Sequence, residues 1–209
     1  MSEATEPAAA TQVTVAGRRT PMVLSVARAL REGLERGGQL PADTSPRTVL
    51  LRSAVDAQQA FLTFADGGVT VAADPAGDAD VTWEVRWSNP TPAEAGDDPF
   101  AQRVAGLLAG GSGDWRQAAE RFWSRAGALP GLPEGLQVFC ADDEGEAVVG
   151  APGPDGQGVL GTAAALTSFF DGRATMLEVL EGGEFGINIS FPVLSALLGA
   201  NLKVVCGEL

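Results

Sequence analysis

The sequence predicts an α+β fold, in which an antiparallel or mixed β-sheet is covered by helices. Segments of alternating apolar residues recur between residues 48 and 87, and this period of two is typical of half-buried strands. Helix-period segments stand on either side, at residues 21–36 and 100–108. The stretch 158–205 then joins short apolar strands and helices through glycines. Strands and helices grouped in this way favour an α+β arrangement.

The composition narrows the classes of function. The 209 residues include 14 basic and 27 acidic side chains, a net charge of −13, so nucleic-acid phosphates would repel the chain and we expect no such partner. The sequence has no His and no Tyr, which removes the commonest general base and the commonest metal ligand. We therefore expect a protein that is not an enzyme and that has no cofactor and no metal site.

Cysteine usage and hydropathy suggest a compartment. Cys140 and Cys206 are too few for a disulfide framework and are expected to be buried thiols in a reducing environment. The first residues lack the basic and apolar regions of a secretory signal. No apolar run reaches the roughly 18 residues that a membrane span needs. We expect a cytoplasmic protein with no integral membrane segment.

The first half begins with a polar tail and continues into a helix and strands. Residues 1–20 are expected to be a disordered tail, although Val13-Thr14-Val15 is also compatible with docking on a partner. Thr20 and Pro21 have the residue types of an N-cap and a first helical position. The strands are expected to form an antiparallel meander with one face in the core. They are predicted at residues 48–52, 60–64, 69–72 and 81–87.

The composition places the main internal boundary after a second helical region. The Gly- and Pro-rich stretch 127–135 separates a first α+β unit, residues 21–126, from a second one, residues 134–209, unless both belong to one fused domain. The halves share a weak similarity, because Val104–Gly110 aligns with Leu166–Gly172. An internal duplication and a chance agreement of two amphipathic helices both explain this alignment.

Several segments resemble the sterol carrier protein type 2 (SCP2-like) family. Its order is an opening helix, a strand meander, a fourth strand ending in a DADVT-like phrase, a helix ending in Gly, a short helix, a final strand and a closing helix. Residues Asp78–Thr82 match the phrase, and residues 163–172, 175–180 and 183–205 resemble the C-terminal half. The resemblance covers about residues 22–205 in two incomplete copies. The first has no clear final strand and closing helix after Trp123, and the second lacks the phrase before its helix.

The resemblance implies an apolar tunnel between sheet and helices that holds a lipid, an acyl chain or a sterol. The family also includes accessory domains without chemistry of their own. We expect binding of a hydrophobic small molecule; the alternative is a ligand-free interaction module whose apolar surface contacts a protein partner or a second copy. Candidate pocket residues are Leu166, Phe169, Phe170, Met176, Leu177, Leu180, Phe185, Ile187, Ile189, Phe191, Leu194, Leu197 and Leu198. Candidate polar contacts for a head group are Thr167, Asn188 and Ser190.

Two acidic clusters have the residue types of a cation site or an acid/base site. Asp142-Asp143-Glu144 and Asp97-Asp98 both lie in turns that contain glycine. Solvated turns carry the same residue types, and no EF-hand spacing is present. We therefore predict turns at both places.

Overall fold

The computed structural model describes residues 13–41, 45–75, 77–110, 113–152 and 157–209. The fold is mixed α and β, with two mixed sheets, and the chain divides into two compact units, residues 1–109 and 110–209. The division falls earlier than the Gly- and Pro-rich stretch 127–135 suggested. Helix α3 (Trp115–Ala126) buries its apolar face against α4 (Ala163–Phe170), so it belongs to the second unit.

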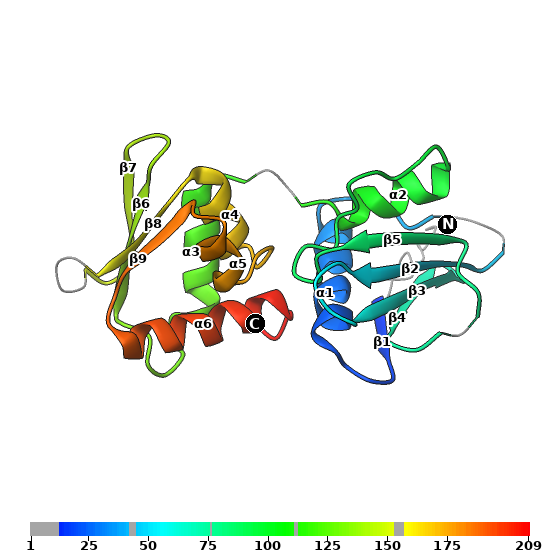
Figure 1. The fold of residues 1–209 in the computed structure, drawn as a ribbon, viewed down its shortest axis with the longest axis horizontal. Helices are drawn as coiled ribbons and strands as arrows, with labels where there is room; N and C mark the ends of the chain where they lie inside the picture. Colours follow the sequence, from blue (N-terminus) through cyan, green and yellow to red (C-terminus); the bar gives the residue numbers. More distant parts are fainter. Residues whose placement is uncertain (1–12, 42–44, 76, 111–112, 153–156) are drawn as a thin grey trace, which may run out of the picture. The chain divides into compact units, whose positions relative to one another are not determined.

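The first unit places its helices on one face of a five-stranded sheet (Figure 1). Helix α1 packs on β3 and β4, and α2 packs against α1. Gly33 of α1 permits this close approach, because a Cβ atom there would collide with the backbone carbonyl of Leu107 in α2. The elements are β1 (Val13–Ala16), α1 (Pro21–Glu35), β2 (Arg47–Ser53), β3 (Gln59–Ala65), β4 (Gly68–Ala72), β5 (Val81–Val85) and α2 (Pro99–Leu108).

The sheet of the first unit has the order β1-β4-β3-β2-β5. The expected antiparallel meander is confirmed for β2, β3 and β4, but it is wrong for β5, which pairs in parallel with β2. After β4 the chain returns beside the start of β2, where Asp80 contacts Thr48, so β5 runs in the same direction as β2. The DADVT-like phrase, residues 78–82, leads into β5 and does not end it.

Part of the expected tail belongs to the sheet. Residues 13–16 form β1, which pairs in parallel with β4, Val13 opposite Val69 and Val15 opposite Val71. The side chains of Val13 and Val15 pack against the core of the unit, and this contact stabilises a short edge strand that local pattern alone does not specify. Residues 1–12 lie outside the described residues.

The second unit is built on a four-stranded sheet with the order β7-β6-β8-β9. Strands β6 and β7 form an antiparallel hairpin, and β8 pairs in parallel with β6. Strand β9 pairs antiparallel with β8 and is the edge strand on that side. The described helices lie on one side of this sheet (Figure 1). Besides α3 and α4, the elements are β6 (Gly135–Cys140), β7 (Gly145–Gly150), β8 (Gly158–Gly161), α5 (Met176–Glu181), β9 (Phe185–Asn188) and α6 (Phe191–Val205).

The two units share one topological motif. In each, a helix precedes an antiparallel hairpin, and a later strand pairs in parallel with the first strand of that hairpin. A helix follows this parallel strand in both, α2 in the first unit and α4 in the second. These are the two helices whose sequences align.

Candidate functional site

The space between the sheet and the helices of the second unit is filled. Phe122, Phe169 and Phe170 lie in mutual contact, with ring centroids 4.9–5.8 Å apart, and Phe185 lies 5.0 Å from Phe169. Tilted and edge-to-face rings at such separations leave little free volume. The predicted pocket residues that are fully buried in this core are Leu166, Phe169, Phe170, Met176, Phe185 and Leu197.

The other predicted pocket residues lie at the margin of this core or outside it. The partly buried ones that pack against it are Leu180, Ile187, Ile189, Leu194 and Leu198. Leu177 and Phe191 are 61% and 80% exposed, so they lie on the surface of the unit and not in its core. Strand β9 ends at Asn188, and Phe191 is already the first residue of α6, next to Pro192 in the opening turn. Phe191 therefore does not continue the inward alternation of β9.

The three candidate polar residues have different surroundings. The Thr167 hydroxyl donates to the Ala163 carbonyl one helical turn earlier, at 2.7 Å, which is a local helix contact. Ser190 is the exposed N-cap residue of α6, and its side chain makes no capping hydrogen bond. Asn188 is exposed at the end of β9 and is the one of the three that lines a surface hollow.

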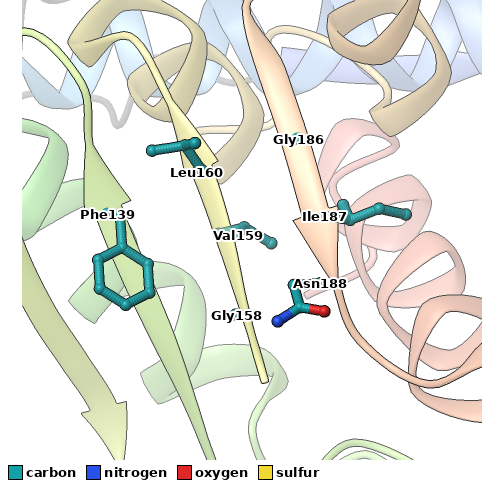
Figure 2. Close-up of a pocket in the computed structure, with 7 residues that line it drawn as sticks. All are labelled: Phe139, Gly158, Val159, Leu160, Gly186, Ile187 and Asn188. Carbon is teal, nitrogen blue, oxygen red and sulfur yellow. The ribbon is translucent and has the colours of Figure 1, made fainter. Parts of the chain in front are cut away.

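This hollow is a groove of about 310 Å³ on the sheet of the second unit. The pleat directs Phe139, Leu160 and Asn188 to the face opposite the helices, because their neighbours Val138, Val159 and Ile187 face the core. Figure 2 shows Phe139 on β6, Leu160 on β8 and Asn188 on β9 around it. The groove is lined by Phe139, Gly158, Val159, Leu160, Gly186, Ile187 and Asn188.

Two glycines form the floor of the groove. Phe139 stands opposite Leu160, which stands opposite Gly186, and Gly158 stands opposite Asn188 in the neighbouring row. Since Gly158 and Gly186 have no side chains, only backbone lies at these two positions, partly exposed at Gly186 and buried at Gly158. Phe139 and Leu160 are 36% and 50% exposed. The result is an open apolar surface with one amide side chain at its end.

Sequence reasoning found Ile187 and Asn188 but missed the rest of the groove. A signal was present, because Val138-Phe139-Cys140 and Val159-Leu160 are consecutive apolar residues in strands. Such runs are typical of strands that have apolar side chains on both faces. The apolar character of the outer face can therefore be predicted from the sequence. The groove cannot, because it depends on which strands become neighbours in the sheet.

The acidic turn between β6 and β7 anchors both flanking helices. Asp142 accepts a hydrogen bond from the backbone N–H of Ala163 at the start of α4, at 2.7 Å. Asp143 accepts from the Arg116 guanidinium at 2.9 Å and from the Trp115 indole at 3.3 Å, both in α3. The hydrogen bond from Arg116, supported by that from Trp115, lowers the pKa of Asp143 to about 2. The cluster therefore has a structural role.

Asp98, in the other acidic cluster, caps α2. Its carboxylate accepts from the backbone N–H of Phe100 and pairs with Arg47 at 2.6 Å. These contacts, led by Arg47, lower the pKa of Asp98. Across the described residues, no group of three or more Cys, Asp or Glu side chains is placed to hold a metal ion.

Comparison of the chain with protein-family models, with curated proteins and with solved structures finds no match. Within the part of the chain that the structure describes, no helix combines the length and apolar character needed to cross a bilayer.

Proposed function

We propose that the second unit binds the apolar part of a small molecule, such as an acyl chain or a sterol-like ring system, in the groove on the outer face of its sheet. The observation that carries this proposal is the pairing of apolar walls, Phe139 and Leu160, with a floor of Gly158 and Gly186. The volume of the groove, about 310 Å³, is at the lower end of the range of small-molecule sites.

Binding is driven by the removal of apolar surface from water. Each ligand methylene that the groove covers contributes about 0.8 kcal/mol. Phe139 and Leu160 are exposed in the free protein, so a ligand also covers their side chains. The Asn188 amide at the end of the groove offers a donor and an acceptor to a polar head group.

The order of elements in the second unit supports an SCP2-like relationship. A helix that ends at Asp171-Gly172 is followed by the short helix α5, the final strand β9 and the closing helix α6. The motif shared by the two units supports an internal duplication. The proposed ligand position differs from an interior tunnel, because aromatic side chains fill the interior of the unit.

A role in binding, without catalysis, fits the side chains available. The sequence has no His and no Tyr, and the described residues that line the groove are apolar or glycine except for Asn188, whose side chain is a neutral amide. The proposed site positions an apolar group and leaves any chemistry to another protein.

The test is ligand capture by the purified chain, followed by substitution in the groove. Native mass spectrometry and organic extraction identify a co-purified lipid, and a fluorescent fatty acid then serves as the probe for titration. Leu160→Asp is expected to weaken binding of the probe by more than about tenfold, since a charge replaces an apolar wall that the bound probe covers. Val55→Asp, an equally exposed apolar position in the first unit, is the matched control and should bind as the wild type.

Two results would contradict the proposal. One is a wild-type protein that carries no lipid and does not bind the probe. The other is a Leu160→Asp variant that binds the probe as tightly as the Val55→Asp control.

A further inference from the structure

The edge of the second sheet at β9 has open backbone hydrogen-bonding groups. In an antiparallel pair, residues alternately direct their N–H and C=O groups to the partner strand and away from it. The Thr162 N–H donates to the Glu184 carbonyl, so Gly186 and Asn188 also face β8, and Ile187 faces outward. Among the described residues, the backbone N–H and C=O of Ile187 have no hydrogen-bond partner.

Strand β9 contains no charged side chain between its first residue and its last. Edge strands commonly carry charged side chains that prevent pairing with another chain. Strand β7 has Glu146, β5 has Glu84, and β1 is followed by Arg18-Arg19. In contrast, residues 185–202 contain no charged side chain, and the nearest acidic residue is the exposed Glu184, directly before the strand. A second copy that pairs along residues 185–189 therefore brings no like charges opposite each other within that span.

We infer that β9 pairs with β9 of a second copy of this chain, antiparallel and around a two-fold axis at Ile187. The two Ile187 residues then exchange both of their open N–H and C=O groups. In this register, Phe185 lies opposite Ile189 of the second copy, so the cross-strand pairs on the helix side are all apolar. Each copy contributes its own β9 to the interface, as two-fold symmetry requires.

The pairing also completes the groove, a consequence that rests on the proposed function. Gly186 of one copy lies opposite Asn188 of the second copy, on the outer face of the joined sheet. The groove floor at Gly186 therefore gains an amide side chain from the second copy. Each groove is then flanked by two amides, its own Asn188 and that of the other copy.

The oligomeric state of the full chain tests the inference without any ligand. Analytical ultracentrifugation of the delipidated protein is expected to show a species of twice the 21.4 kDa chain mass. Ile187→Pro removes the outward N–H, which has no partner within the described residues, and is expected to yield a monomer. Circular dichroism establishes whether this variant is folded.

Disulfide cross-linking provides a second test that does not depend on the proline variant. In the proposed register the two Ile187 Cα atoms lie about 5.5 Å apart, within the range that a disulfide spans. Ile187→Cys is expected to form a covalent dimer under mild oxidation. Val148→Cys, an exposed position on the opposite edge strand β7, is the control and should remain monomeric on a non-reducing gel.

The outcomes separate this inference from the proposed function. A monomeric wild type at all concentrations, or equal cross-linking at residues 187 and 148, overturns the β9 interface. A dimer that persists in a folded Ile187→Pro variant also overturns it. A wild-type dimer with selective cross-linking at residue 187 supports the interface even where the fatty-acid probe does not bind, and that result rejects only the ligand.

Discussion

The carboxylate of Asp80 accepts a hydrogen bond from the backbone N–H of Thr48 at 2.7 Å, and the backbone N–H of Asp80 donates to the Thr48 carbonyl at 2.9 Å. This reciprocal contact joins the segment that enters β5 to the start of β2. The contact explains the aspartate at the third position of the DADVT-like phrase, Asp80. It fixes the position at which β5 begins to pair in parallel with β2.

Asp80→Ala is expected to lower the free energy of unfolding by about 1 kcal/mol, because one side-chain hydrogen bond at the sheet edge is lost. Urea denaturation measures this change. Asp78→Ala is the matched control two residues earlier, at an exposed position, and should change stability by less than about 0.5 kcal/mol. Equal effects of both substitutions would show that the Thr48 contact contributes nothing specific.

The buried side chain of Asn201 joins three helices of the second unit. Its Nδ2 donates to the carbonyls of Phe169 and Ala174 at 3.0 and 3.1 Å, and its Oδ1 accepts from the N–H of Met176 at 3.0 Å. Asn201→Leu removes all three hydrogen bonds and leaves the Met176 N–H and the Ala174 carbonyl without this buried partner, so we expect a loss of about 3 kcal/mol in unfolding free energy. Leu202→Ala, at an exposed neighbouring position, should have a much smaller effect. A stable Asn201→Leu variant would refute this assignment.

The low pKa of Asp143 predicts a dependence of stability on acid. The folded-state pKa of about 2 lies below the usual value of 3.8, so this carboxyl contributes stability above pH 3.8 that is lost as the pH falls toward 2. Asp143→Asn removes this titration. The unfolding free energy of the variant should therefore fall less than that of the wild type between these two pH values. Parallel pH profiles for the two proteins would contradict the prediction.

Phe169 and Phe191 differ in burial, and substitutions at the two positions test which ring belongs to the core of the second unit. Phe169→Ala removes a fully buried ring that contacts three others and is expected to cost about 3–5 kcal/mol of unfolding free energy. Phe191→Ala is the matched control, because that ring is mostly exposed, and should change stability by less than about 0.5 kcal/mol. Similar losses for both variants would mean that Phe191 is buried in solution.

Local signals in the sequence were sufficient where one segment determines its own structure. Thr20 does cap α1, since its hydroxyl accepts from the Val23 N–H, and Pro21 begins the helix. The apolar face of α4 was also predicted correctly, because helical periodicity places Leu166, Phe169 and Phe170 on one side.

Long-range pairing could not be predicted in the same way. Strand β1 has four residues, and it is stabilised by β4, more than 50 positions later in the chain. The direction of β5 depends on the edge that the chain reaches after β4. The location of the groove depends on how completely the rings of Phe122, Phe169 and Phe170 fill the interior, and a list of apolar residues does not contain that information.

The two glycines of the groove floor differ in how much change they tolerate. A Cβ atom at Gly158 would meet the Gln137 carbonyl at 2.6 Å, whereas at Gly186 the nearest atom is the Leu160 carbonyl oxygen at 4.0 Å. A methyl group at residue 186 therefore makes the groove shallower without disturbing the sheet, while one at residue 158 forces strands β6 and β8 apart. Residue 186 is therefore the position at which one substitution changes the depth of the groove and leaves the pairing of its strands intact.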